Sequence, residues 1–275
     1  MKQNKHFSLM TVVLAASSLV FTSCSDNVDN PVNPQDGDKR YVLSEMTHTF
    51  DVGVYWHFFF SYDDAGRLIL EESYQTNTDF PIDRHVDYTY GNNVILEDNY
   101  SLERIHTLHL NAAGLLVDYE YYADGIDEPR HYIYQYDDSN RLVSVIAPGD
   151  KVFTLTWEDG EIVSIVDNGG TTITIVPSSV LVTNGFCMLD NVSGIDLTRV
   201  LLGVHGTLPR HQPATVASFS QTESSTISVE RNYSYTVTDG LLTNIAEQKT
   251  YKCHTPSIDI EQDDNIDYVL VWKEL

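Results

Sequence analysis

Cysteine is scarce in this chain, with three residues among 275: Cys24, Cys187 and Cys253. Their spacing shows no disulfide framework of the kind that holds small secreted domains together. Cys187 and Cys253 could bond to each other outside the inner membrane, but two buried thiols are the favoured interpretation. Cys24 directly follows an uncharged segment and needs a separate explanation.

Basic residues are also few. The chain has 16 Lys and Arg against 40 Asp and Glu, a formal net charge of −24. Such a field repels phosphate backbones and anionic headgroups, so it argues against nucleic-acid binding and against membrane attachment through a basic patch. Binding of cations or of neutral ligands is compatible with this charge. Hydrophobic residues at 42% and charged residues at 20% are ordinary for a folded protein.

Recognisable catalytic motifs are absent: the chain has no nucleophile elbow, phosphate loop, dinucleotide fingerprint or zincin motif. His106 and His109 lie three apart in "HTLH", a spacing that points them to opposite faces of a strand and prevents joint metal binding. Carboxylates are so numerous that a glycosidase-like pair would arise by chance. We therefore predict a protein that is not an enzyme, with no catalytic residues, metal site or cofactor.

No apolar run is long enough for a membrane-spanning helix. Lys2 and Lys5 precede an uncharged stretch from Phe7 to Ser23, the layout of a secretory signal, and the stretch is interrupted by serines. The sequence "FTSCSDN" (21–27) resembles a bacterial lipobox, in which the cysteine thiol is lipidated. We predict a lipoprotein signal peptide over 1–23 and lipid attachment at Cys24, with a chance cysteine as the alternative.

The segment after Cys24 is polar and rich in Asp, Asn, Pro and Gly: "SDNVDNPVNPQDGDK" (25–39). It cannot contribute to a core, so we predict a flexible tether over 24–39 and a single β domain over 40–275. Ser25 and Asp26 resemble the acidic export signal of surface lipoproteins. We therefore expect an outer-membrane lipid anchor facing the cell exterior, with the periplasmic face as the alternative.

One unit recurs beyond Tyr41. It is seen in "FFFSYDDAGRLILEESY" (58–74), "LHLNAAGLLVDYEYY" (108–122) and "YIYQYDDSNRLVSVI" (132–146), with shorter copies at 153–166 and 233–246 and a variant at 86–100. Apolar or aromatic residues alternate, as in a strand with one buried face. The Asp residues can begin a tight turn, which Gly66 or Asn140 can close in the left-handed conformation. The sequence therefore predicts an all-β fold, mainly antiparallel, forming a curled meander or an incomplete β-barrel of repeated hairpins with one short helix.

The helix is expected within a helix-loop insertion near 193–213. Ser193 and Asp196 resemble a capping box, Ile195, Val200, Leu201 and Val204 form a helical stripe, and Gly203 or Gly206 can end it. We expect it to plug or cover one end of the curled sheet rather than to gate a ligand. Arg210 and His211 in the following loop are interpreted as a solvated pair.

The hairpin unit resembles the YD-type repeat of bacterial surface proteins. Leader, tether and meander together resemble a family of uncharacterised Bacteroidota lipoproteins with a porin-like, up-and-down β fold, and "DLTRVLLGVHGTLPRHQP" (196–213) is similar to that family's helix and loop. The resemblance implies the fold and no activity. A pore is not expected, because "EESYQ" and "EDNYS" would put acids into hydrocarbon.

Three functions remain. The favoured one is a surface-exposed, non-catalytic binding module whose 17 tyrosines could stack on a glycan or pack against an envelope protein, the ligand being unknown. The alternatives are a structural or envelope-assembly component, and, less favoured, a glycan-acting hydrolase. A contiguous exposed aromatic strip would favour the first, an apolar concave interior without polar groups the second, and a cleft with two carboxylates of perturbed pKa the last.

Overall fold

The computed structural model describes residues 40–50, 53, 55–76, 83–100, 103–122, 128–188 and 197–275. These residues form sixteen strands and one helix. The bounds in chain order are β1 Tyr41–Phe50, β2 Tyr55–Tyr62, β3 Leu68–Thr76, β4 Asp83–Gly91, β5 Val94–Asn99, β6 Arg104–Leu110, β7 Leu116–Tyr121, β8 Arg130–Tyr136, β9 Leu142–Ala147, β10 Lys151–Glu158, β11 Glu161–Asp167, β12 Thr172–Leu181, α1 Leu197–Leu201, β13 His211–Gln221, β14 Thr226–Thr238, β15 Leu241–His254 and β16 Asp259–Glu274.

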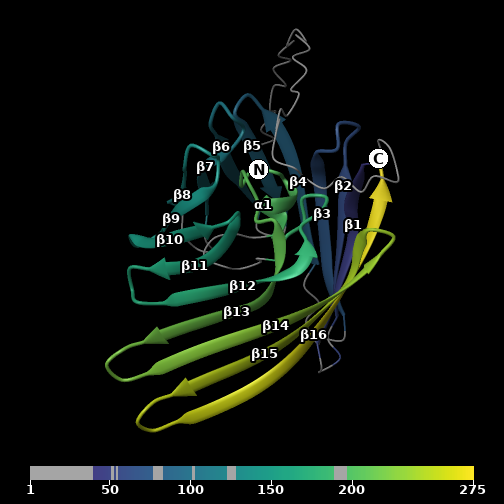
Figure 1. Cartoon of the computed structure of the whole chain (residues 1–275). Coiled ribbons are helices and arrows are strands. Elements are labelled where there is room, and N and C mark those ends of the chain that lie inside the picture. Colours follow the sequence, from purple (N-terminus) through teal and green to yellow (C-terminus); the bar gives the residue numbers. More distant parts are fainter. Residues whose placement is uncertain are drawn as a thin grey trace, which may run out of the picture. The chain divides into compact units, whose positions relative to one another are not determined.

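The strands form a closed antiparallel barrel in sequence order. Each strand pairs with the strands before and after it, and β1 also pairs with β16 over nearly its whole length, from Tyr41 opposite Glu274 to Phe50 opposite Ile266 (Figure 1). The prediction of an all-β meander with one short helix is confirmed. Closure, which the sequence left open, is complete because the first and last strands pair with each other. No helix among the described residues is long and apolar enough to span a membrane.

The tight turns follow the predicted chemistry. After β2, the Asp63 carboxylate accepts hydrogen bonds from two backbone N–H groups of the turn, at 3.0 and 2.9 Å, and Gly66 has a φ of 76°. After β8, Asp137 accepts the same two bonds at 2.9 and 3.0 Å, and Asn140 has a φ of 57°. The aspartate and the left-handed residue therefore have the roles expected of them in the repeats.

Aromatic side chains tie hairpins to neighbouring strands. The Tyr62 hydroxyl donates to the backbone carbonyl of Leu43 at 2.9 Å, and the Tyr136 hydroxyl donates to that of Leu116 at 2.9 Å. The same contact is made by Tyr90 to Leu68, Trp157 to Leu142, Tyr235 to Pro213 and Trp272 to Leu242. Each acceptor lies at an irregularity in strand pairing, where a β-bulge interrupts the ladder. Each of these aromatics therefore donates a side-chain hydrogen bond to a carbonyl at a point where the ladder is interrupted.

The interior of the barrel is mainly apolar, and its exterior carries charged residues among exposed apolar ones. Leu68, Val86, Leu108 and Ile165 are inaccessible to solvent and belong to one cluster of packed side chains. Outward-facing charged residues occur around the ring and include Glu45, Glu72, Asp87, Glu120, Glu230, Lys252 and Asp267. A channel-forming barrel would instead have a polar interior and a continuous apolar outer band.

The acids of "EESYQ" and "EDNYS" are divided between the two faces of their strands. Glu71 of "EESYQ" and Glu97 of "EDNYS" are 1% and 5% exposed, whereas the Glu72 side chain is 52% exposed. Neighbouring residues of a strand point to opposite faces, so only one acid of each adjacent pair can face outward. An acid therefore faces outward, as expected, at Glu72, while Glu71 and Glu97 face the interior.

The helix α1 packs against inward-facing side chains. Leu197 and Val200 are buried, and the turn after the helix closes at Gly203, whose N–H donates to the Val200 carbonyl at 3.0 Å. Gly203 has a φ of 71°, as a helix-ending glycine requires. Ser193, Ile195 and Asp196, which were expected to begin the helix, lie outside the described residues.

The predicted signal peptide (1–23), Cys24 and the tether (24–39) also lie outside the described residues, so lipid attachment at Cys24 stays a prediction. Cys187 and Cys253 are both free thiols. Cys187 is completely buried, and burial raises the pKa of its thiol; Cys253 is half-buried.

Candidate functional site

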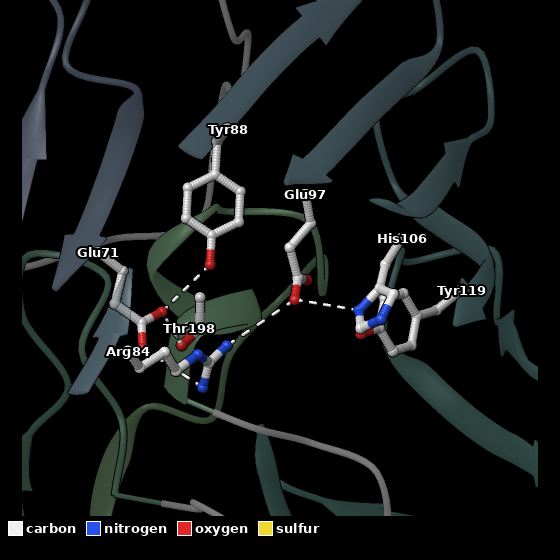
Figure 2. Close-up of polar contacts among 7 residues, drawn as sticks. All are labelled: Glu71, Arg84, Tyr88, Glu97, His106, Tyr119 and Thr198. Atoms are coloured by element: carbon white, nitrogen blue, oxygen red, sulfur yellow. Dashed lines mark hydrogen bonds and ion pairs between the residues drawn. The ribbon is translucent and has the colours of Figure 1, made fainter. Parts of the chain in front are cut away.

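A group of polar side chains lies inside the barrel where β3 to β7 face α1 (Figure 2). Glu71 of β3 accepts hydrogen bonds from the Tyr88 hydroxyl at 3.1 Å and from the Thr198 hydroxyl of α1 at 2.9 Å. Its other carboxylate oxygen lies 3.5 Å from an Arg84 guanidinium nitrogen. A carboxylate is tolerated in an apolar interior when it is paired and hydrogen-bonded, and Glu71 meets both conditions.

Glu97 of β5 is the second buried carboxylate of this group. It lies 3.3 Å from Nδ1 of His106 and 3.8 Å from the Arg84 guanidinium. The same His106 nitrogen lies 2.9 Å from the Tyr119 hydroxyl. Arg84 therefore stands between Glu71 and Glu97, so that one half-exposed cation serves two buried acids (Figure 2).

The electrostatics of this group keep Glu97 ionised. Burial alone would raise the pKa of Glu97, but the hydrogen bond from His106 and the positive charges of Arg199 and Arg84 outweigh it and hold the pKa below its usual value. A carboxylate of low pKa is a poor proton donor at neutral pH, and burial keeps this one away from a substrate. The pair Glu71 and Glu97 therefore gives no support to the hydrolase alternative.

Two residues of the helix segment add to the buried group. The guanidinium carbon of Arg199 lies 3.9 Å from the centre of the Tyr119 ring. His205 is 4% exposed, and its ring lies 5.6 Å from that of Tyr134. Neither ring nitrogen of His205 has a hydrogen-bond partner among the residues that the structure describes. Burial, assisted by the charge of Arg199, lowers the pKa of His205 to about 3, so the imidazole is neutral.

A second cluster around a buried carboxylate lies between the C-terminal strands. Glu247 of β15 is 4% exposed and accepts a hydrogen bond from the Tyr268 hydroxyl of β16 at 2.8 Å. Nε of Arg231, on β14, lies 3.2 Å from the same carboxylate. This cluster and the one beside α1, here called the inner clusters, each combine a buried glutamate with a tyrosine and an arginine.

Sequence analysis singled out none of Glu71, Arg84, Glu97 and Glu247. A signal was present in the alternation of the strands: Arg84 is in phase with the buried Val86 in "RHV". A charged residue at a position where alternation expects an apolar one indicates a buried ion pair.

Two predictions about histidines have different outcomes. His106 is buried inside the barrel, whereas His109 lies in the outward row opposite Asp118, so the two face opposite sides as expected. His211 was expected to be solvated, with Arg210, and this is wrong for His211. Its Nδ1 lies 2.7 Å from the Glu161 carboxylate, because β13 begins beside the start of β11. Arg210 is exposed.

The outer face of β2 and β3 carries a contiguous set of rings, here called the outer aromatic strip: Tyr55, His57, Phe59 and Tyr74. The Tyr74 ring stacks on His57 at 4.7 Å and on Phe59 at 5.8 Å between centroids, and Tyr55 stacks on His57 at 6.5 Å. Tyr74 is 38% exposed and the other three are half-buried. The strip is a partly exposed aromatic surface, of the kind that would favour a binding module.

Within the described part of the chain, no three His, Cys, Asp or Glu side chains are placed to hold one metal ion. Neither the inner clusters nor the outer aromatic strip therefore has the donor set of a metal centre.

Comparison with known proteins gives one informative likeness. No family model matches the chain, and no curated protein matches it. Among solved structures, a porin-like protein from Bacteroides uniformis superposes with a TM-score of 0.62, at 14% sequence identity, over 83% of this chain and 98% of the other. At that identity the likeness concerns the fold alone: this chain has a porin-like β-barrel.

Proposed function

We propose that this protein is a lipid-anchored, non-catalytic binding module of the outer membrane that faces the cell exterior. The observation that carries the proposal is the outer aromatic strip, displayed on a barrel whose interior is filled. Because apolar side chains occupy the interior, the surface that can meet a ligand or partner is the outer one.

The anchoring part of the proposal is supported by the sequence and by the barrel wall. Acids such as Glu72 and Asp87 on the outer face would be costly against hydrocarbon. A lipid on Cys24 would attach the protein to a membrane without immersing that wall. The barrel would then stand in water, where its charged exterior is favourable.

The ligand class follows from the strip and from the charge. Stacked tyrosine and phenylalanine rings provide rigid apolar area for sugar rings or for a partner protein. The net charge of −24 disfavours polyanions. A glycan or an envelope protein without strong negative charge is therefore the expected ligand.

The test is a binding screen of the intact protein, purified in detergent, against neutral and acidic polysaccharides and solubilised envelope fractions. We expect saturable binding that weakens at least about tenfold in Tyr74→Ala, because the strip loses its central ring. Tyr100→Ala is the matched control, since Tyr100 is 55% exposed and stands outside the strip. Absence of binding across the whole panel would reject a binding module and favour the envelope-assembly alternative.

A further inference from the structure

A recess lies on the outer face of β12 to β16. It has a volume of about 470 Å³ and is here called the outer groove; it is lined by Thr172, Thr174, Ala217, Ser218, Phe219, Ser228, Val229, Glu230, Gln248, Thr250, Lys252, Glu261 and Asp263. Its volume lies within the range of small-molecule sites. β14, β15 and β16 are the longest strands, and their hairpins extend well beyond the shorter ones (Figure 1).

The floor of the outer groove is made of two complete cross-strand rows. One row is Thr174, Ala217, Glu230, Thr250 and Asp263, and the next is Thr172, Phe219, Ser228, Lys252 and Glu261. Side chains in such rows project from the same face of the sheet. Five strands at about 4.8 Å spacing span about 19 Å, so the groove offers a long polar surface across the strand direction.

Several polar groups of the floor are already held in place. Thr250 donates a hydrogen bond to Asp263 at 2.7 Å. The Glu230 carboxylate accepts one from Asn232 at 2.9 Å. Lys252 lies 2.7 Å from Glu261. Side chains that are ordered before a ligand arrives lose less conformational entropy on binding.

One aromatic ring stands among these polar groups. Phe219 is 45% exposed, which is a large apolar area to leave in water at the side of hydroxyl, amide and carboxylate groups. A ring next to hydrogen-bonding side chains suits a ligand that is apolar on one face and carries hydroxyls at its edges. Sugar rings have this character.

The charge of the groove further restricts the class of ligand that it can bind. Three carboxylates, those of Glu230, Glu261 and Asp263, face one ammonium, that of Lys252. The surplus of negative charge repels acidic polymers, while carboxylates accept hydrogen bonds from neutral hydroxyls.

We propose that the outer groove binds a stretch of uncharged oligosaccharide lying across β12 to β16, with Phe219 stacked against a sugar ring. The inference rests on the proposed function in taking the protein to be a binding module. The site itself is separate from the outer aromatic strip, because β1 lies between β16 and β2 in the barrel.

The experiment is calorimetric titration of the intact protein with soluble neutral glucans, mannans and galactans, and with an acidic polygalacturonate. We expect at least one neutral glycan to bind and the acidic polymer to bind more weakly. Phe219→Ala should weaken the neutral ligand at least about tenfold, and Asp263→Asn several-fold. Val271→Ala is the matched control, because Val271 is equally exposed, at 45%, on the outer face of β16 beyond the groove. Thermal melts confirm that the variants are folded.

The outcomes separate this inference from the proposed function. If Phe219→Ala has no effect while Tyr74→Ala abolishes binding, the protein is a binding module and the groove is not its glycan site. Tighter binding of the acidic polymer also overturns the groove assignment. If no glycan binds but an envelope component does, the groove inference fails and the proposed function stands; if nothing binds, both fail.

Discussion

The two inner clusters of the barrel combine the same residue types but connect different parts of the fold. In each, a buried glutamate accepts a hydrogen bond from a tyrosine hydroxyl and lies beside an arginine. The two sets are Glu71, Arg84 and Tyr88, and Glu247, Arg231 and Tyr268. The C-terminal set joins three consecutive strands, whereas the N-terminal set also receives the Thr198 hydroxyl of α1. The difference indicates that a strand-to-strand ion pair becomes an anchor for a non-strand segment when one further donor reaches the carboxylate.

The largest expected effect comes from removing the two carboxylates. Glu71→Leu leaves two hydroxyl groups without their acceptor and removes one of the two carboxylates beside Arg84, and we expect it to lower the free energy of unfolding by about 3–5 kcal/mol. Glu247→Leu removes the carboxylate that Tyr268 and Arg231 contact within the three C-terminal strands, and it should lie at the low end of that range. Chemical denaturation followed by tryptophan fluorescence measures both.

Glu72→Gln is the control, because Glu72 adjoins Glu71 but faces water, and little change is expected. Equal losses for Glu71→Leu and Glu247→Leu would contradict the anchoring of α1 by the N-terminal cluster.

A smaller effect is expected where the helix segment returns to the sheet. The Thr207 N–H donates to the Asn140 carbonyl at 2.9 Å, and a Cβ at Gly206 would lie 2.2 Å from that oxygen. Gly206→Ala should therefore destabilise the barrel by about 2–4 kcal/mol, by strain and by displacing the segment. Gly114 has a similar φ of 79° with open space around it, and Gly114→Ala should cost only about 1–2 kcal/mol. Similar melting temperatures for the two variants would show that the contact is not needed.

The effect that is smallest at neutral pH concerns His205, and it grows only as the solution becomes acidic. Because the pKa of His205 is about 3 when folded and about 6.5 when unfolded, the unfolded chain binds more protons between these values. The loss of stability that His205 causes is absent above about pH 6.5, and it grows by up to about 1.4 kcal/mol for each pH unit below that value. His205→Phe should remove this part of the slope. His48, whose pKa burial lowers to about 4, keeps a slope of the same sign.

Melting temperatures of the native protein and His205→Phe between pH 7.5 and 4.5 test this expectation. The two curves should converge near neutral pH and separate as the solution becomes acidic. Parallel curves would mean that His205 does not titrate differently in the folded and unfolded states.

The hairpins could be predicted from the sequence because their signals are local. Asp63 and Gly66 lie within one turn, and the alternating aromatics before them lie within one strand. The inner clusters could not be predicted in this way, because β-bulges shift the alternation. Strict alternation from the buried Leu68 would place Glu72 inside, but an irregularity in the β2–β3 pairing turns Glu71 inward instead.

The binding surfaces depended on information that spans strands. Tyr74 and Tyr88 are both strand tyrosines, yet Tyr74 is exposed in the outer aromatic strip while Tyr88 is buried beside Glu71. The outer groove requires the register of five strands, because its two rows take one residue from each. A short stretch of sequence sets neither which side chains of a strand face inward nor how that strand is aligned with its neighbours.

Closure of the ring through β1 and β16 has a consequence for the folding of the chain. The first described strand finds its second partner only in the last one, so the contact with the greatest sequence separation is also the one that completes the barrel. Such contacts form slowly, because a long loop must close before they contribute stability. During synthesis, β1 has an unpaired edge until β16 emerges. A chain that stops before Asp259 would have two unpaired strand edges, which can pair with other chains, and would not close into a smaller barrel.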